Sequence, residues 1–229
     1  MQERPEMEKP FSRDLLGVVL AGGQSRRFGG DKALFPLEGR AMAAWALLAL
    51  EPWTSEQVVI TNQERVAGDL GVQGRPDRIQ GLGPVGGLFT ALTWAEEQGR
   101  DGVFLLACDL PLVSSELVGR ILGRWGAGPP AVVPESPGPL GFEPLCGGYG
   151  VGGLPSLEKL LSTSKRSMED ALLAMGGHRI PITEMGTVEE LALAFTNVNT
   201  IDTAGMVQRL LRERHSPTPG SQEELGGTP

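Results

Sequence analysis

The feature that most constrains the fold is a short apolar segment that opens directly into a glycine-rich, basic stretch. Residues 15–21, Leu-Leu-Gly-Val-Val-Leu-Ala, have the length and the β-branched content of a buried strand. Residues 22–32 follow with four glycines, which let a backbone turn tightly and approach a bulky ligand closely. The basic side chains of this stretch are Arg26, Arg27 and Lys32. A strand that ends in such a loop is typical of sites that bind phosphate groups.

Neither of the two common phosphate-binding signatures fits this stretch. A P-loop requires glycine directly before its lysine and Ser or Thr after it, whereas Lys32 lies between Asp31 and Ala33. The dinucleotide signature G-x-G-x-x-G does not occur between Gly22 and Gly30. On spacing alone, an ordinary strand-to-helix turn with solvated basic side chains explains the stretch equally well.

Length and composition favour one domain and exclude several classes of function. The chain has 229 residues, of which 40% are apolar and 21% charged, as expected of a protein with one sizeable core. Its net charge of −8 argues against a nucleic-acid binder. Cys108 and Cys146 form no C-x-x-C pair and are interpreted as free thiols. With His178 and His215 as the only histidines, neither a histidine zinc site nor a Ser-His-Asp triad is expected.

The hydropathy pattern predicts a cytoplasmic protein without a membrane segment. Residues 1–13 are charged and polar and lack the apolar core of a signal peptide. No run approaches the roughly 18 apolar residues of a membrane span. We predict a flexible tail at 1–13, one domain at 14–213 and a disordered, Pro-, Gly- and Glu-containing tail at 214–229.

Alternating strand and helix patterns predict an α/β fold, a Rossmann-like doubly wound and mostly parallel sheet between two layers of helices. Strands are expected at 15–21, 57–61, 102–108, 131–134, 179–182 and 195–198. Helices are expected at 41–50, 64–70, 85–98, 114–125, 155–161, 167–175 and 202–212. Ligands of such sheets bind at the carboxyl ends of the strands, so the loops that follow strands are the candidate sites.

Three polar side chains lie in such loops. Asp109 follows the clearest strand and precedes Pro111, a position suited either to Mg²⁺, which prefers one or two carboxylates, or to a helix cap or turn. Asp77 belongs to a glycine-rich segment that leads into a helix, whose free amides could face a nucleotide; a surface loop is the alternative. Asn62 ends the second strand and is either a ligand of a base or ribose or a simple turn residue.

The glycine-rich stretch resembles the signature L-A-G-G-x-S-x-R-M-G-x-D-K of a group of nucleotidyltransferases, with Phe28 in place of methionine. Among these it is most similar to the molybdenum cofactor guanylyltransferase (MobA) family, in which aspartate typically precedes the lysine. Residues 108–111 match the family's C-D-x-P, and residues 75–87 are similar to D-x(n)-G-P-L-A-G, with Val-Gly-Gly in place of Leu-Ala-Gly. Residues 195–200 match F-x-N-(I/V)-N-T, although Ile-Asp replaces the usual Pro-Glu directly afterwards.

Two looser matches complete the resemblance, which runs in order from about residue 17 to 207. Residues 141–145 resemble a Q/E-P-L segment that precedes the family's next strand, and residues 165–167 resemble a G-x-R-S-L segment. The resemblance implies the three-layer α/β/α fold of nucleotide-diphospho-sugar transferases. The implied nucleotide-binding residues are Leu20, Ala21, Gly22, Gly23, Lys32, Asn62, Asp77, Gly83 and Asp109.

The same resemblance implies the remaining roles in the site. Arg27 and Lys32 would hold the triphosphate and act in catalysis with Asp109, which would bind Mg²⁺. The residues implied to bind the acceptor are Arg166, Asn197 and Asn199. For the two asparagines, Asx turns that fix the last helix are an equally good interpretation.

The reaction implied is transfer of GMP from GTP to the terminal phosphate of molybdenum-molybdopterin, with release of pyrophosphate. The attacking phosphate is already ionised, so positioning and electrostatic stabilisation suffice and no general base is needed. Partners would be the two substrates and the molybdenum-cofactor insertion proteins or apo-molybdoenzymes that receive the product, with no nucleic acid and no membrane.

Three alternatives stay open: a molybdopterin cytidylyltransferase, a nucleotidyltransferase that acts on another phosphorylated acceptor, and a nucleotide-binding regulator. The presence of both Asp109 and Lys32 argues against the regulator, because a protein that only binds nucleotide has little need of the metal carboxylate.

Overall fold

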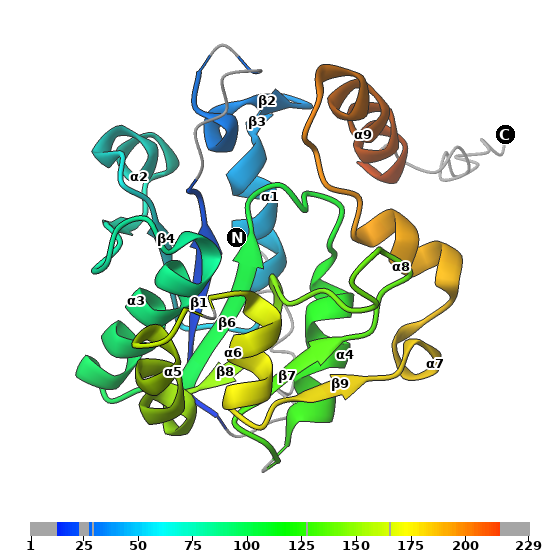
Figure 1. The fold of residues 1–229 in the computed structure, drawn as a ribbon. Coiled ribbons are helices and arrows are strands. Elements are labelled where there is room, and N and C mark those ends of the chain that lie inside the picture. Colours follow the sequence, from blue (N-terminus) through cyan, green and yellow to red (C-terminus); the bar gives the residue numbers. More distant parts are fainter. Residues whose placement is uncertain (1–12, 23–27, 29, 127, 165, 216–229) are drawn as a thin grey trace, which may run out of the picture.

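The computed structural model of the protein is a three-layer α/β/α arrangement built on one seven-stranded sheet (Figure 1). It describes residues 13–22, 28, 30–126, 128–164 and 166–215. The strand order is β5-β4-β1-β6-β8-β7-β9. The bounds are β1 (Leu15–Leu20), β4 (Glu56–Ile60), β5 (Gln73–Arg75), β6 (Gly102–Ala107), β7 (Ala131–Pro134), β8 (Cys146–Gly150) and β9 (His178–Ile180).

Strand β1 lies at the centre of a parallel set. It pairs in parallel with both β4 and β6, so that Val18 lies opposite Val58 on one side and Leu105 on the other. Strand β5 extends this parallel set beyond β4. In this sheet only β8 runs in the opposite direction, antiparallel to both β6 and β7. The mostly parallel sheet confirms the predicted fold class and brings the carboxyl ends of β1, β4 and β6 to one edge.

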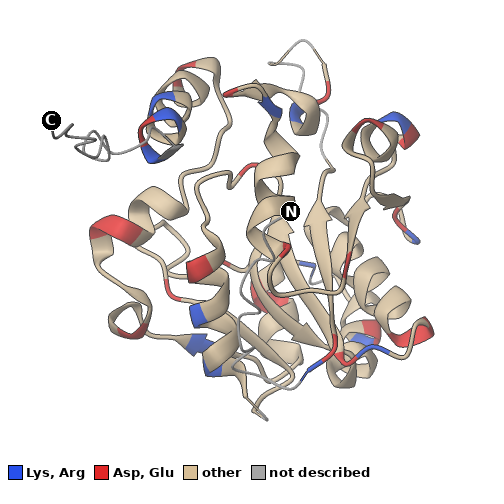
Figure 2. Cartoon of the chain, turned by 180° about the vertical axis from the view of Figure 1, so that it is seen from behind, with Lys and Arg blue, Asp and Glu red and all other residues tan. Residues whose placement is uncertain are grey.

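Helices cover both faces of the sheet because its central strands are apolar on both sides. Neither β1 nor β6 contains a charged residue (Figure 2). Within β1, Leu15 and Val19 belong to one buried cluster, whereas Leu16 and Val18 belong to another. This alternation is the two-residue period of a strand buried on both faces.

The two clusters assign the helices to their layers. Helices α1 (Met42–Leu50) and α4 (Ser115–Trp125) pack in the first cluster, and α3 (Gly83–Glu97), α5 (Leu154–Leu161) and α6 (Met168–Ala174) pack in the second. The remaining elements are η2 (Lys32–Leu34), β2 (Pro36–Leu37), β3 (Arg40–Ala41), α2 (Glu64–Leu70), η3 (Val151–Gly153), α7 (Ile182–Met185), α8 (Val188–Ala194) and α9 (Ile201–His215).

A third, smaller apolar cluster fixes the C-terminal helix next to the glycine-rich stretch. Leu37, Trp45, Leu112, Val198 and Val207 are buried together there, so that β2, α1, the loop after β6 and α9 meet. Across the surface of this cluster, the Arg212 guanidinium donates two hydrogen bonds to the Glu38 carboxylate, at 2.7 and 3.1 Å. We call the buried residues of this third cluster the α9 cluster. Figure 1 shows α9 beside β2.

Most of the predicted elements are present within a residue or two of their expected bounds. Helix α2 has the predicted bounds, and Ser114 caps α4 by accepting the Leu117 N–H, as expected of serine at an N-cap. The predicted tails at 1–13 and 214–229 lie almost entirely outside the described residues. Within the described residues, none of the helices is long and apolar enough to span a bilayer.

Two predicted strands need correction. Residues 195–198 form no strand. Phe195 is the C-cap of α8. Val198 is buried in the α9 cluster, and its N–H donates to the Asp109 carbonyl. A buried loop therefore produced the apolar pattern of a strand. The strand expected at 179–182 is β9, which ends at Ile180, before α7 begins at Ile182.

Strand β8 gave no sequence pattern of its own because glycines occupy three of its five positions. A Cβ on Gly148 would lie 2.4 Å from the Trp125 ring, and one on Gly147 would lie 2.5 Å from the Val132 carbonyl oxygen. Close packing against α4 and β7 therefore requires glycine where strand propensity would favour β-branched residues.

Candidate functional site

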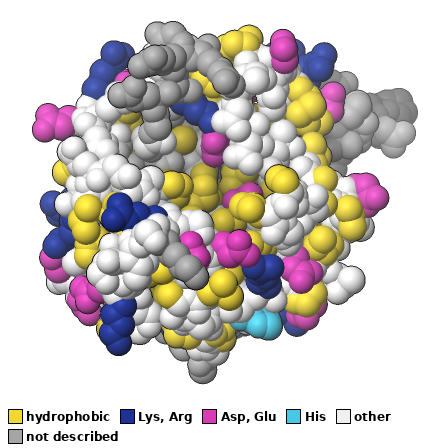
Figure 3. Space-filling view, in the orientation of Figure 1, with side chains coloured by type: hydrophobic (Ala, Val, Ile, Leu, Met, Phe, Trp, Pro, Cys, Tyr) yellow, Lys and Arg dark blue, Asp and Glu magenta, His cyan; other side chains and the backbone are white. Residues whose placement is uncertain are grey.

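A cavity of about 600 Å³ opens at the carboxyl edge of the sheet. Residues that follow β1, β4 and β6 line it, together with η2 and the start of α3. The surface is hollowed at this place, with apolar side chains at the floor (Figure 3). A cavity at the ends of adjacent parallel strands is where sheets of this type bind their ligands.

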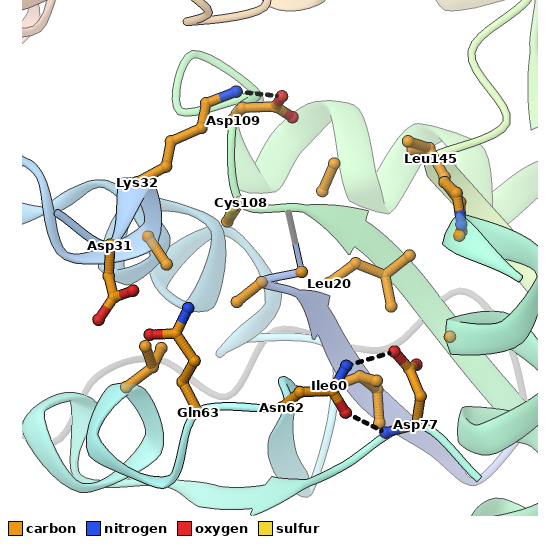
Figure 4. A pocket seen from close by; sticks show the side chains of 18 of the residues that line it. Leu20, Asp31, Lys32, Ile60, Asn62, Gln63, Asp77, Cys108, Asp109 and Leu145 are labelled. Carbon is orange, nitrogen blue, oxygen red and sulfur yellow. Dashed lines mark hydrogen bonds and ion pairs between the residues drawn. The ribbon is translucent and has the colours of Figure 1, made fainter. Parts of the chain in front are cut away.

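One end of the cavity, which we call the phosphate end, is defined by Lys32, Asp109 and Asn199. Lys32 Nζ lies 2.6 Å from Asp109 Oδ2 and 2.6 Å from Asn199 Oδ1 (Figure 4 draws the first contact). The Lys32 and Asp109 side chains are only 15% and 20% exposed, so solvent screens their attraction incompletely. The three residues come from η2, the loop after β6 and the loop before α9, which are far apart in sequence.

Backbone hydrogen bonds from three directions hold the turn that carries Asp109. The Cys108 N–H donates to the Leu20 carbonyl at 3.0 Å, and the Ala107 N–H donates to the Leu145 carbonyl at 2.8 Å. The Asp109 carbonyl itself accepts the Val198 N–H at 3.0 Å. The carboxylate is therefore fixed relative to β1, the segment before β8 and the segment that contains Asn199.

The buried thiol beside this turn is not a nucleophile at neutral pH. Burial, and then the negative charge of Asp109, raise the pKa of Cys108 to about 12. The thiol therefore stays protonated, and it contributes to the cavity wall as a small apolar group.

The other end of the cavity, which we call the base end, is defined by Asn62 and Asp77. Asn62 Nδ2 donates to Asp77 Oδ2 at 2.9 Å, and the Asp77 backbone N–H donates to Asn62 Oδ1 at 3.0 Å (Figure 4). Because the backbone N–H can only donate, this reciprocal pair also fixes which way the Asn62 amide faces. The pair joins the end of β4 to the segment between β5 and α3.

The first turn of α3 forms the wall next to Asp77. Gly83 has a φ of +58°, a left-handed conformation that glycine adopts without strain, and Pro84 follows in the first turn. Leu82 at the N-cap makes no side-chain capping bond, so the first-turn N–H groups are left for a ligand. A Cβ on Gly87 would lie 2.8 Å from the Leu20 side chain and 3.8 Å from Asp77 Oδ1, so the absence of a side chain keeps this wall open.

Most of the residues predicted from sequence lie around this one cavity. Those that line it are Leu20, Ala21, Gly22, Lys32, Asn62, Asp77, Gly83 and Asp109, and Asn199 reaches it through Lys32. Gly23 and Arg27 lie outside the described residues. Asn197 is exposed and outside the lining, and so is Arg166, whose Nε donates to the Thr163 carbonyl at 3.4 Å.

Sequence reasoning missed several lining residues and one neighbouring acid. Asp31, Gln63 and Leu145 line the cavity without belonging to the predicted set. Glu143 accepts a hydrogen bond from the backbone N–H of Leu145. Burial, together with the negative charge of Asp109, raises the pKa of Glu143 to about 7, and the hydrogen bond from Leu145 opposes this rise. In the sequence, the one indication of Glu143 was the resemblance of residues 141–145 to the Q/E-P-L segment, to which no function was assigned.

The carboxylates available fit a magnesium ion that arrives with a nucleotide. Among the described residues, no three His, Cys, Asp or Glu side chains converge as a ready-made metal site. Asp109 supplies one carboxylate, and Mg²⁺ commonly takes one or two carboxylates with water and substrate phosphates. Lys32 now neutralises this carboxylate and is the group that a metal ion would replace.

Comparison with known proteins agrees with this geometry. A probable molybdenum cofactor guanylyltransferase of Thermococcus kodakarensis is 33% identical over 211 residues, which cover 89% of this chain and 98% of that protein. Its counterpart from Opitutus terrae is 34% identical over 162 residues, 70% of this chain and 79% of the relative.

Solved structures share the fold. Molybdopterin-guanine dinucleotide biosynthesis protein A from Archaeoglobus fulgidus has a TM-score of 0.69 at 23% identity, covering 87% of this chain and 100% of that chain. The 4-diphosphocytidyl-2C-methyl-D-erythritol synthase from Anaerococcus prevotii has a TM-score of 0.66 at 12% identity, covering 87% and 96%. The family model of the MobA-like NTP transferase domain matches residues 17–178, more than half of the sequence. The chain therefore belongs to the MobA-like NTP transferase family of nucleotidyltransferases.

Proposed function

We propose that this enzyme is a molybdenum cofactor guanylyltransferase, which transfers GMP from GTP to the terminal phosphate of molybdenum-molybdopterin and releases pyrophosphate. The observation that carries the proposal is the meeting of Lys32 and Asp109, 2.6 Å apart, at one end of a cavity whose other end presents Asn62 and Asp77. Binding of a triphosphate requires a positively charged side chain and a carboxylate that can hold Mg²⁺. Binding of a base requires hydrogen-bonding groups that are fixed in place. The names of the relatives at 33 and 34% identity support the same reaction.

The base end favours guanine over cytosine. Asp77 Oδ2 accepts from Asn62, which leaves Oδ1 to accept from a ligand, and this oxygen faces the open wall at Gly87. Guanine offers two neighbouring N–H donors on its pairing edge, and the two lone pairs of Oδ1 can accept from them. Cytosine offers one donor beside two acceptors, so its acceptors would face carboxylate oxygens. Sites that hydrogen-bond their substrate discriminate strongly when the partner group is wrong.

The phosphate end supplies charge rather than proton transfer. Lys32, released from Asp109, would bind the triphosphate oxygens and offset the repulsion between the two anionic substrates. A Mg²⁺ ion held by Asp109 would neutralise charge on the α-phosphate and the departing pyrophosphate. The attacking phosphate is already ionised and needs no general base. The Cys108 thiol, whose pKa is raised to about 12, therefore has no part in the reaction.

The acceptor phosphate would enter beside Asn199, whose Oδ1 lies 2.6 Å from Lys32 Nζ. The contact with Lys32 supports a role for Asn199 in acceptor binding, whereas the roles proposed for Asn197 and Arg166 depend on the family resemblance alone. We further propose that the enzyme works in the cytoplasm and that insertion proteins or apo-molybdoenzymes receive the product.

The test is pyrophosphate release with GTP, CTP or ATP, each with Mg²⁺ and with or without molybdenum-loaded molybdopterin. We expect release with GTP that depends on the acceptor. Faster release with CTP would replace the proposal with the cytidylyltransferase alternative. Nucleotide binding without release in the presence of the acceptor would instead support the regulator.

A further inference from the structure

Glu143 is an acidic residue beside the site that the reaction above does not use. It lies between β7 and β8, where its N–H donates to the Pro134 carbonyl at 2.9 Å. Its Oε1 accepts the backbone N–H of Leu145 at 3.1 Å, and its own carbonyl accepts the Cys146 N–H at 3.3 Å. The side chain therefore closes the turn that leads into β8.

This turn is connected to Asp109 by one further hydrogen bond. The carbonyl of Leu145 accepts the Ala107 N–H at 2.8 Å, two residues before Asp109. The Leu145 side chain also lines the cavity. Glu143, Leu145 and Ala107 thus form a short hydrogen-bonded path from a carboxylate to the turn that carries Asp109.

We propose that Glu143 is a positioning residue of the active site, which fixes the Asp109 carboxylate through the backbone of Leu145 and Ala107. The proposal rests on the proposed function, because it assigns Asp109 a role that requires accurate placement. Among the described residues, the Leu145 contact is the one of the three backbone contacts around Asp109 in which a side chain also accepts a hydrogen bond from the contacting residue's N–H. Displacement of a reacting group by about 1 Å can cost a large factor in rate.

Local sequence explains why a side-chain acceptor is needed at this place. Strand β8 begins Cys146-Gly147-Gly148, and glycines hold a backbone weakly in one conformation. The hydrogen bond from the Leu145 N–H to Glu143 Oε1 compensates for that weakness directly before the strand begins.

A purely structural role, closing the turn before β8, is the competing interpretation, and Glu135 provides a matched control for it. Glu135 is also partly buried and follows β7, and its Oε2 accepts the backbone N–H of Ile182 at 3.3 Å. That N–H belongs to the first residue of α7, which does not line the cavity. Loss of either carboxylate removes one hydrogen bond to a backbone N–H. Of the two residues, Glu143 is the one connected to the turn of Asp109 by the hydrogen bonds through Leu145 and Ala107.

The experiment compares Glu143→Ala, Glu143→Gln and Glu135→Ala in GTP-dependent pyrophosphate release. We expect Glu143→Ala to lower kcat by about tenfold or more, with KM for GTP changed by less than about threefold, since the base end is untouched. Glu143→Gln keeps an oxygen acceptor and should stay within about threefold of the wild type, as should Glu135→Ala. Equal losses in Glu143→Ala and Glu135→Ala, or no rescue by glutamine, would overturn the proposal.

Backbone amide exchange separates this proposal from the proposed function. In Glu143→Ala we expect exchange across residues 105–112 to accelerate by about tenfold, with no such change in Glu135→Ala. This measurement needs no substrate, so it tests the hydrogen-bonded path even if the wild type releases no pyrophosphate. Unchanged exchange in folded Glu143→Ala would reject the positioning role, whereas a wild type without activity would reject the guanylyltransferase.

Discussion

The two ends of the cavity are built in different ways, although each consists of polar side chains joined by hydrogen bonds. At the base end, Asn62 and Asp77 are 15 residues apart; Asn62 is exposed and Asp77 is partly buried. At the phosphate end, Lys32 is 77 residues from Asp109 and 167 residues from Asn199, and the charged pair is mostly shielded from water. The base end therefore depends on one local segment, whereas the phosphate end depends on the packing of the whole chain, including α9.

The largest effect should come from removing charge at the phosphate end. We expect Asp109→Asn and Lys32→Ala each to lower kcat for pyrophosphate release by roughly a hundredfold or more, about 2.7 kcal/mol of barrier. Asp101→Asn is the matched control, because Asp101 lies at the other end of β6 and accepts the Asp14 N–H there at 2.8 Å. Near-normal turnover in either variant would remove that residue from the mechanism.

The next effect is on stability and depends on pH. Glu143 has a pKa of about 7 in the folded protein and an ordinary value of 4.5 when exposed, so the folded state binds the proton more tightly. Its contribution to the free energy of unfolding is therefore full below about pH 4.5 and is lost as the pH rises through about 7. Relative to Glu143→Gln, we expect the wild type to lose on the order of 2–3 kcal/mol of stability over this range.

Chemical denaturation of both proteins at several pH values measures this difference. Using the glutamine variant as the reference cancels the titration of all other groups. A constant difference between pH 5 and pH 8 would contradict the assigned environment of Glu143.

A smaller effect is expected from the base end, and it should concern selectivity rather than turnover. Asp77→Asn replaces an acceptor pair with one acceptor and one donor, so the ratio of kcat/KM for GTP over CTP should fall by about fivefold, ~1 kcal/mol. The kcat at saturating GTP should change little, because Lys32 and Asp109 are unaffected. Kinetics with both nucleotides provide the measurement, and an unchanged ratio would mean that Asp77 does not read the base.

The smallest effect should follow loss of the exposed ion pair between Glu38 and Arg212. Hydrogen bonding and charge from Arg212 lower the pKa of Glu38, but the Arg212 side chain is 66% exposed, so water screens the pair at the surface of the α9 cluster. We expect Glu38→Gln to change turnover by less than about twofold, and less at high salt. A much larger loss, measured across a salt series, would show that the ion pair and not the apolar cluster holds α9 in place.

The sequence predicted best where a single local pattern determines the structure. The apolar runs of β1 and β6, the N-cap at Ser114 and the end of α3 near Gly99 all follow from short-range rules. Lys32 and Asp109 were likewise predicted, each from its own segment, to belong to one site, and they lie 2.6 Å apart.

Prediction failed where a partner distant in sequence decides the outcome. Val198 has the character of a strand residue, but burial against β2 and α9 makes it part of a loop. Strand β8 forms because its glycines fit against Trp125, a contact that its own sequence does not indicate. The reciprocal bond between Asn62 and Asp77 and the path from Glu143 to Asp109 depend on side-chain placement, which a motif does not specify.

The α9 cluster has a consequence for protein synthesis. Chains are made from the N-terminus, so Lys32, Asp109 and the base end are complete before the residues that contain Asn199 and α9 leave the ribosome. The contact between Lys32 and Asn199 closes a loop of 167 residues, and contacts of such long range are the kind that form slowly. A nascent chain therefore holds Asn62, Asp77, Lys32 and Asp109 before it can make the contact to Asn199.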